Sequence, residues 1–325
     1  MPMEPIRIGV VGSGRFGSLH AQTLLSLAES ELVALVDSSE KALAQLPEAL
    51  SAIPKYLDLE QALKESRAEA WVVATSTLEH VPVAKQILEA GVFVLLEKPI
   101  SDNLLDAQHL QEVVSQCSEK LMLGHILLFN SEFRALQTEC ETRGGFDYTT
   151  CYRMRPCKHA DDYPGETPFH LTMVHDLYCI QSMVDGKDPA RFDAQTHFNS
   201  RGNMDLALAQ LGWADGSLAT FSAGFLTPEA LPGEGFDRME VFGKGWMARM
   251  NPNPRPLDVW DEKYVPPMTL EILTGSNSTT GMLAEELRCF CRVVRGLEPI
   301  PRGTRIEDGI QVMRWLDRLT EASGP

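Results

Sequence analysis

The sequence predicts an α/β domain with a doubly wound parallel sheet, and three features of its first 37 residues carry this prediction. An apolar run over residues 6–11 is typical of a buried parallel strand. The G-x-G-x-x-G sequence of residues 12–17 follows directly, and a helical pattern of leucines comes after it. A second apolar run, residues 32–36, ends at Asp37, 20 residues beyond Gly17. This context favours a dinucleotide-binding turn over a glycine turn with a purely structural role.

The glycines of this motif, Gly12, Gly14 and Gly17, are needed for three different reasons. The first permits a tight turn, the second lets the backbone approach a pyrophosphate, and the third lets the helix pack against the strand. The helix that follows would direct unpaired N–H groups and the positive end of its dipole at phosphate. We therefore expect these glycines, together with Arg15 and Phe16 between them, to bind the cofactor.

Asp37, at the end of the second predicted strand, indicates which dinucleotide is bound. A carboxylate there can accept hydrogen bonds from both ribose hydroxyls of an adenosine, and it would repel a 2′-phosphate. The sequence therefore favours NAD over NADP. The polar residues Ser38, Ser39 and Lys41 leave NADP open as the less favoured cofactor.

Helical and apolar patterns continue in alternation through the first 124 residues. We expect helices over residues 40–50, 58–64, 82–90 and 101–118, and strands over 55–56, 70–74, 92–96 and 121–124. Asp58 is the expected N-cap of the second of these helices, and Ser101 or Asp102 that of the last.

Loops after the carboxyl ends of parallel strands line the ligand crevice of such a sheet. Thr75 and His80 follow the strand over residues 70–74, so both are expected to bind or border the cofactor. Glu97-Lys98-Pro99 ends the next strand. Lys98 at this position can act on a substrate hydroxyl or carbonyl, with a pKa lowered by desolvation and by the nearby nicotinamide charge. Composition alone would favour a surface lysine, but the place at a strand end favours the functional interpretation.

The length, the composition and the net charge of the chain exclude several classes of protein. The 325 residues are 44% hydrophobic and 23% charged, as in a globular protein with two domains, and the formal net charge is −16. This balance argues against nucleic acid and anionic membranes as partners. We find no apolar run long enough to span a bilayer and no secretory signal.

The cysteines indicate a reducing cytoplasm. There are seven, an odd number at irregular spacing, which is typical of free thiols. Cys289 and Cys291 look like a metal-binding fragment, but residues two apart on a helix do not face each other. Core packing is the better interpretation, and the sequence suggests no metal site.

The second half predicts strands joined by hairpins, between helices at either end. A helix is expected over residues 130–142 with Ser131 as a candidate N-cap, and later helices over 282–295 and 306–320. Strands are expected over 147–155, 192–199, 206–213, 217–225, 238–242 and 246–250, as an antiparallel meander. The proline-rich stretch 251–268 is expected to be extended or loop-like, and residues 275–281 flexible.

Basic residues cluster at the end of the strand over residues 147–155. Arg153 and Arg155 share one face of it, and Lys158 and His159 follow. The hypothesis is that this cluster binds an anionic part of the substrate. The alternative is a solvated face whose charges pair with Asp161 and Asp162.

His175 and Asp176 interrupt an apolar helical pattern over residues 171–184. A lone histidine on such a face is more often a satisfied core residue. Oxidation of an alcohol, however, needs a proton acceptor near neutral pH, and imidazole suits that requirement.

Several stretches resemble the Gfo/Idh/MocA family of NAD(P)-dependent oxidoreductases. They include IGVVGSGRFGSLHAQTL, ATSTLEHVPVAKQILEAGVFVLLEKPIS, GHILLFNSEFRAL, VHDLYCIQSMV, GFDRMEVFGKGW and LAEELRCFCRVVRGLEPIPRGTRIEDGIQVMRWLDRLTEAS. The resemblance extends over nearly the whole chain. Its most specific signatures are Glu97-Lys98-Pro99 and Glu307-Asp308-Gly309.

The resemblance implies a Rossmann domain over residues 1–124 and an α+β domain over 125–325. The second domain would hold a large, mostly antiparallel open sheet that supports homodimers or homotetramers, with C-terminal helices that can pack back on the first domain. The implied substrates are sugars, inositols and their derivatives. The implied reaction is hydride transfer between NAD and a secondary alcohol. A glycoside hydrolase that uses transient oxidation and a non-catalytic NAD-binding sensor are the alternatives.

The resemblance also implies roles for single residues. Lys98 would orient the substrate hydroxyl and the nicotinamide, with Glu97 beside it at the cofactor, and His175 would be the general base or acid. Many relatives carry an aspartate four residues before that histidine, where this chain has Leu171. Asp176 or His170 would then assist His175, and Tyr178 could reach the same side of the helix. The implied substrate contacts are Lys98, Arg153, Arg155, His170 and His175.

Overall fold

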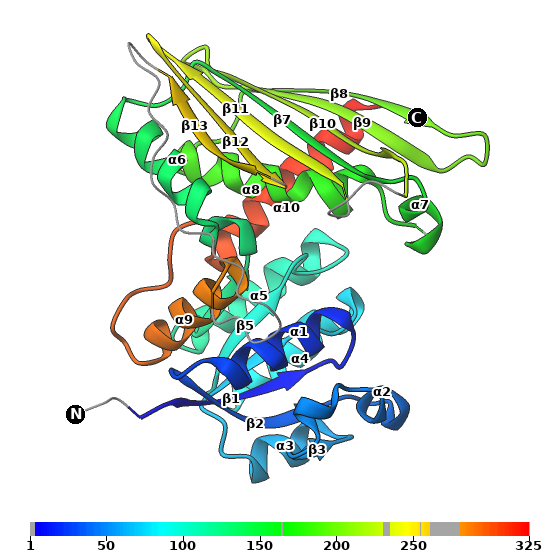
Figure 1. The fold of residues 1–325 in the computed structure, drawn as a ribbon, viewed down its shortest axis with the longest axis vertical. Helices are drawn as coiled ribbons and strands as arrows, with labels where there is room; N and C mark the ends of the chain where they lie inside the picture. The colour runs from blue at the N-terminus through cyan, green and yellow to red at the C-terminus, as the bar shows by residue number, and fades with distance from the viewer. Residues whose placement is uncertain (1–3, 164, 230–234, 254, 261–279, 325) are drawn as a thin grey trace. The chain divides into compact units, whose positions relative to one another are not determined.

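The computed structural model describes residues 4–163, 165–229, 235–253, 255–260 and 280–324. The chain folds into two compact units, which Figure 1 shows as a ribbon. The first unit comprises residues 1–129 and 271–310, and the second comprises residues 130–270 and 311–325. The late helix α9 (Met282–Val294) therefore belongs to the same unit as the N-terminal sheet.

The first unit is built on a parallel sheet of six strands. In space the strands run β3 (Lys55–Tyr56), β2 (Ser30–Val36), β1 (Ile6–Val11), β4 (Ala70–Val73), β5 (Phe93–Glu97) and β6 (Leu121–Gly124). Every neighbouring pair is parallel. The order reverses between β1 and β4, and a doubly wound sheet binds its ligand beside that point. The predicted fold class of this half is confirmed.

Helical segments connect these strands or follow the last of them. They are α1 (Arg15–Ser26), α2 (Glu40–Ala44), η1 (Glu48–Leu50), α3 (Leu59–Glu65), α4 (Thr77–Glu89), α5 (Leu104–Gln116) and η2 (Ile126–Phe129). The predicted helix over residues 40–50 is divided, because Pro47 lacks the N–H that an α-helix would use there. Asp58 caps α3 as predicted, since its carboxylate accepts from the Gln61 N–H at 2.8 Å.

Two predicted caps are wrong. Helix α5 is capped by Asn103, whose side-chain oxygen accepts from the Asp106 N–H at 2.9 Å, and not by Ser101 or Asp102. Helix α6 (Ser131–Thr142) is capped by Asn130 in place of Ser131, with 2.9 Å to the Phe133 N–H. In both cases neighbouring residues could all serve as caps, and asparagine is among the best of them.

The second unit holds a mixed sheet, which has seven strands among the described residues. Its order is β13 (Arg255–Trp260), β12 (Trp246–Asn253), β11 (Phe236–Gly243), β7 (Tyr148–Pro156), β10 (Leu218–Thr227), β9 (Met204–Gly212) and β8 (Arg191–Phe198). The mostly antiparallel sheet is confirmed, but it is no simple meander. Strand β7 lies between two hairpin ladders and pairs parallel with β10.

Helical segments of the second unit complete it. They are α6, α7 (His159–Asp162), the π-helical turn η3 (Phe169–Met173), α8 (Val174–Met183) and the greater part of α10 (Ile306–Ala322). Within the proline-rich stretch, β13 is a strand where a loop was also considered. Residues 251–253 of that stretch end β12, and residue 254, residues 261–268 and most of residues 275–281 lie outside the described residues.

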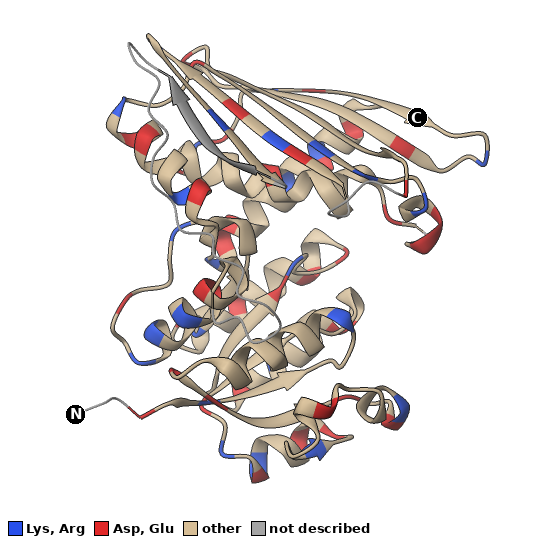
Figure 2. Ribbon diagram, in the orientation of Figure 1, with Lys and Arg blue, Asp and Glu red and all other residues tan. Residues whose placement is uncertain are grey.

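Three features of the structure agree with the expectations from composition: the distribution of charged residues, the state of the cysteines and the character of the helices. Figure 2 shows acidic and basic residues interspersed along the helices and strands of both units. All seven cysteines are free thiols, as predicted. In the described part of the chain, no helix is both long and apolar enough to cross a membrane.

Candidate active site

The glycine turn after β1 has the geometry that its sequence predicts. Gly12 has a φ of +97°, and a Cβ there would strike the backbone of Ala74. A Cβ on Gly17 would strike the Gly12 carbonyl oxygen. At Gly14 a Cβ would meet nothing within 4 Å, so the backbone there is open to a ligand. No side chain caps α1 at Gly14, which leaves its first N–H groups available to phosphate.

Asp37 is held in place by backbone N–H groups. Its Oδ2 accepts from Ser13 and its Oδ1 from Ser39, both at 2.8 Å. This carboxylate lines a cavity of about 750 Å³ at the carboxyl ends of β1, β2 and β4. Most of the predicted cofactor-binding residues line the same cavity: Gly12, Gly14, Arg15, Phe16, Asp37 and Thr75.

Two buried histidines, His80 and His20, form hydrogen bonds at or just after the end of β5. Nδ1 of the buried His80 donates to the Pro99 carbonyl oxygen at 2.7 Å, and its Nε2 lies 3.3 Å from the Thr75 carbonyl oxygen. Burial lowers the pKa of His80, which favours the neutral ring. His80 therefore joins the loops after β4 and β5, and it is not among the residues that line the cavity. That it borders the cofactor stays a prediction, because it contacts Thr75, which lines the cavity.

Glu97 is buried and joined to Nε2 of His20 by a 2.8 Å hydrogen bond. Its other oxygen accepts from the Lys98 backbone N–H at 3.3 Å. Glu97 and Lys98 are also not among the cavity-lining residues, and Lys98 is half-buried directly after the strand. The carboxylate of Glu97 faces His20 in the interior, and its cofactor contact stays a prediction.

One group of side chains in the described residues could hold a metal ion, although the sequence suggested none. It comprises His20, Glu97 and Glu286, with ligand atoms all within 4.8 Å of one another. Sequence reasoning missed it, although two signals were visible. His20 lies one turn after Gly17, and Glu286 is an acid on an otherwise apolar helix face.

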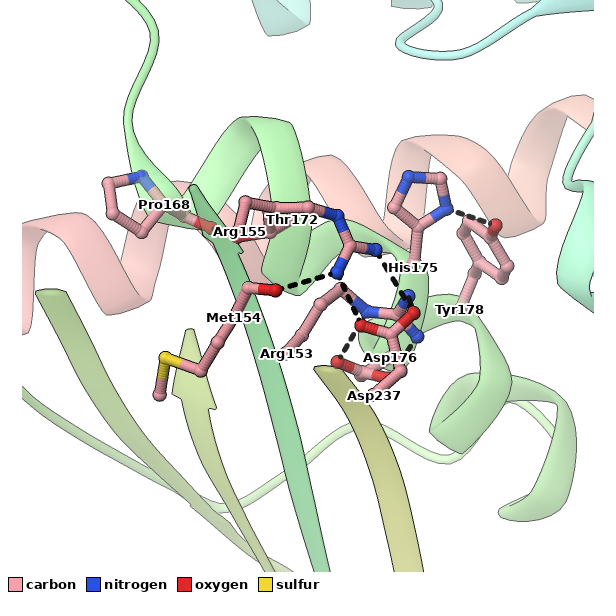
Figure 3. A network of polar contacts seen from close by, with 9 residues as sticks. All are labelled: Arg153, Met154, Arg155, Pro168, Thr172, His175, Asp176, Tyr178 and Asp237. Atoms are coloured by element: carbon pink, nitrogen blue, oxygen red, sulfur yellow. Dashed lines mark hydrogen bonds and ion pairs between the residues drawn. The ribbon is translucent and has the colours of Figure 1, made fainter. Parts of the chain in front are cut away.

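In the second unit, α8 carries His175 directly after the π-helical turn. The imidazole is half-buried, and a 2.6 Å hydrogen bond joins its Nδ1 to the hydroxyl of Tyr178 (Figure 3). Tyr178 is fully buried, so this bond fixes the ring plane of His175. One turn earlier, Nδ1 of His170 lies 3.0 Å from the Thr167 hydroxyl, and burial lowers the pKa of His170.

Asp176 points to the opposite side of α8 from His175, as Figure 3 shows. Its two oxygens accept from Nε and Nη2 of Arg153 at 3.0 and 2.8 Å. The prediction that Asp176 assists His175 is therefore wrong, and Tyr178 is the partner of the imidazole.

Asp237 on β11 completes this network. It accepts from Nη1 of Arg153 at 3.0 Å, and from Nη1 and Nη2 of Arg155 at 2.6 and 3.0 Å. Arg153 is thus a buried structural cation that is already paired, which corrects its expected role in binding an anionic substrate. Pairing of these arginines with Asp161 and Asp162 is wrong as well, and Arg155 is held by the same aspartate as Arg153.

The predicted site residues are therefore distributed over both units. Those of the glycine turn, with Asp37, Thr75 and Lys98, belong to the first unit, and His170 and His175 belong to the second. Each unit brings its own part of the predicted site residues together. The first offers a dinucleotide crevice, with Lys98 after a neighbouring strand, and the second offers an imidazole oriented by a phenol.

Comparisons with known proteins agree with this geometry. The family described as "Oxidoreductase family, NAD-binding Rossmann fold" (GFO_IDH_MocA) matches residues 6–125. Inositol 2-dehydrogenase of Rhizobium meliloti (strain 1021) is 26% identical over 96% of this chain and 95% of its own length. Myo-inositol 2-dehydrogenase of Thermotoga maritima is 30% identical over 42% of this chain and 41% of its length.

A solved structure shares the complete fold. Scyllo-inositol dehydrogenase from Lactobacillus casei, with bound NAD(H) and scyllo-inositol, superposes with a TM-score of 0.81 at 21% identity. The match covers 98% of this chain and 96% of that one. The two-unit architecture is therefore a known fold.

Proposed function

We propose that this chain is a member of the Gfo/Idh/MocA family of oxidoreductases and that it transfers a hydride between NAD and a secondary alcohol or ketone of a polyol, inositol or sugar derivative. The observation that carries the proposal is the crevice of the first unit. Its open glycine turn and its fixed Asp37 carboxylate suit the pyrophosphate and the ribose of a dinucleotide.

Asp37 supports NAD over NADP. Both of its oxygens are already oriented by backbone donors, so the carboxylate cannot swing away from a ribose without breaking two hydrogen bonds. A 2′-phosphate placed against it would meet like charge.

Bound NAD supplies the hydride acceptor, and the residues of this chain bind, orient and move a proton. Lys98 orients the reacting oxygen with its ammonium group. His175 accepts the hydroxyl proton on oxidation and returns it on reduction, with Tyr178 fixing its ring. His170 lies in the π-helical turn that ends just before α8, and it is a polar side chain directly next to Leu171 in sequence. We assign His170 to the substrate for that reason.

Exposed apolar side chains on the second sheet favour a proposal of self-association. Large apolar side chains remain exposed on its strands, among them Tyr148, Phe198, Leu208, Leu226 and Phe236. We propose a homodimer or homotetramer through this sheet, in a reducing cytoplasm that keeps the seven thiols free. Analytical ultracentrifugation tests the first part, and a monomer at micromolar concentration would contradict it.

The dehydrogenase, the hydrolase and the sensor are separated by one assay. Purified protein is incubated with NAD and a panel of polyols, inositols, sugars and glycosides, while reduced cofactor and glycoside cleavage are both followed. We expect steady formation of NADH. Cleavage without NADH would make the protein a hydrolase, and NAD binding with neither signal would make it a sensor.

Two variants test the assigned roles. Lys98→Met and His175→Asn should each lower kcat by about 10²- to 10⁴-fold, the usual contribution of a positioned acid–base group. The control is His109→Asn, which changes an exposed histidine on α5 and should leave kcat unchanged. Full activity in His175→Asn would remove the imidazole from the mechanism.

A further inference from the structure

Three polar side chains meet inside the first unit, away from the cavity. His20 comes from α1, Glu97 from the end of β5 and Glu286 from α9. Their exposed fractions are 0%, 6% and 0%. Their possible ligand atoms all lie within 4.8 Å of one another, so they form a buried cluster that includes the residue directly before Lys98. The proposed mechanism does not use this cluster.

Glu286 is the unusual member of this cluster. Within the described residues, neither of its carboxyl oxygens has a hydrogen-bond partner. An ionised carboxylate buried without donors is far too costly to be retained. Its charged neighbour is Glu97, so a second negative charge would add repulsion to the cost of desolvation.

The donors around Glu97 decide which acid carries a proton. Glu97 faces His20 Nε2 at 2.8 Å and the Lys98 N–H at 3.3 Å, so both of its oxygens already lie beside a donor. Glu286 has no such donors. The proton therefore belongs on Glu286, where it turns an acceptor without partners into a donor.

We propose that Glu286 is held as a neutral carboxylic acid that donates a hydrogen bond to Glu97, and that it thereby positions the strand end carrying Lys98. With His20 and the Lys98 N–H, this gives Glu97 three donors from three directions. The link to Lys98 rests on the proposed function, since it concerns the orientation of the lysine that handles substrate. Burial and the adjacent Glu97 raise the pKa of Glu286 well above its ordinary value, in agreement with the geometry.

A metal ion is the competing occupant, and the environment of His20 argues against it. A histidine that binds a metal almost always donates its other ring N–H to a carboxylate, a carbonyl or water. Nδ1 of His20 is buried and has no partner among the described residues. With the proton on Nε2, facing Glu97, Nδ1 is a bare acceptor, which is less costly than a buried donor without a partner.

The first experiment detects the proton itself and needs no substrate. Infrared spectra of the full chain at neutral pH should contain the C=O stretch of a protonated carboxyl group that is absent in Glu286→Gln. Glu285→Gln is the matched control, because it changes the half-exposed neighbour on the same helix. Persistence of the band in Glu286→Gln would overturn the proposal, and so would stoichiometric metal in the purified protein that this variant loses.

The second experiment tests positioning. Glu286→Gln keeps a donor for Glu97 and should retain kcat, whereas Glu286→Leu removes it. In Glu286→Leu we expect kcat to fall about ten- to hundredfold, as for a small displacement of a reacting group, with little change in the KM for NAD. Equal kcat in both folded variants would refute the positioning role.

Lys98 also offers a readout that does not depend on turnover. The rate at which its Nζ reacts with an acylating reagent, followed by mass spectrometry, should change several-fold in Glu286→Leu and stay constant in Glu286→Gln. This separates the two possible failures. An inactive protein with these Lys98 rates would refute the dehydrogenase and keep the cluster, and unchanged rates in a folded Glu286→Leu would refute the cluster alone.

Discussion

The two units bury polar clusters that are satisfied in opposite ways. In the second unit, Arg153 lies between Asp176 and Asp237, and every contact joins opposite charges. In the first unit, Glu97 and Glu286 lie together with a histidine, without a buried cation in the group. Opposite charges satisfy the cluster of the second unit, and a proton on Glu286 satisfies that of the first in our proposal.

The difference teaches what each cluster can tolerate. Burial alone lowers the pKa of Arg153, but Asp176 and Asp237 raise it well above its ordinary value, so the guanidinium group stays charged. Removing one member would leave buried charges unpaired. The first cluster, with a neutral acid in it, should tolerate the loss of that acid far better. In the second unit, ion pairs of Arg153 therefore hold Asp176 of α8 in place. In the first unit, hydrogen bonds to Glu97 hold the strand end next to Lys98.

The strongest test of this contrast is Arg153→Met, which leaves two buried aspartates without their cation. We expect the free energy of unfolding to fall by about 3–5 kcal/mol, as for other broken buried ion pairs. Urea unfolding at neutral pH measures it. The matched control is Arg201→Met, which removes an exposed pair with Asp161 and should cost at most about 1 kcal/mol.

A compensated variant sharpens the same test. Replacing Arg153 with Met and both Asp176 and Asp237 with Leu removes all three buried charges together, and it should recover much of the lost stability. If Arg153→Met alone cost no more than the Arg201 control, the second cluster would not be the rigid ionic support described here.

The sequence predicted the parts of this molecule that local chemistry determines. The strand, the glycine turn, the helix and Asp37 lie within one short segment, and each residue type there has a distinct backbone or charge requirement. Lys98 at a strand end followed from the same order of elements. Tyr178 as a partner of His175 followed from the spacing of a helix.

Pairings between distant residues were beyond prediction. Arg153 lies 23 residues from Asp176 and 84 from Asp237, so the basic cluster gave no sign that its charges were already matched inside the protein. The parallel pairing of β7 with β10 is non-local in the same way. Glu286 could be seen as an acid on an apolar face, but only the fold brings it to Glu97.

The pH dependence of the first unit gives a second, smaller test. Nδ1 of His125, at the end of β6, donates to the Gly303 carbonyl oxygen at 2.6 Å, and burial lowers its pKa to about 4. Between pH 6.5 and 4 the unfolded chain binds a proton that the folded chain excludes. The free energy of unfolding should therefore fall by about 3 kcal/mol as the pH drops through that window.

The measurement is urea unfolding at closely spaced pH values for the natural chain and for His125→Asn. The variant removes one titrating group, so its stability should change less between pH 6.5 and 4, even where it is lower at pH 7. An identical slope in both proteins would show that His125 is charged, or exposed, in the folded state.

Asp37 differs from both clusters, because neutral backbone N–H groups satisfy its charge in place of a cation or a proton. Its replacement should therefore have the smallest effect on stability. Asp37→Asn keeps one acceptor oxygen and loses one hydrogen bond, so we expect a cost of about 1 kcal/mol. The removed charge should matter more to the ligand, with the NAD-over-NADP preference in kcat/KM falling about tenfold or more. Asp58→Asn is the control, since Asp58 lines the same cavity and asparagine is an equally good N-cap. If both variants kept the natural preference, the ribose would be read by another group, and the fixed carboxylate would serve only to shape the turn after β2.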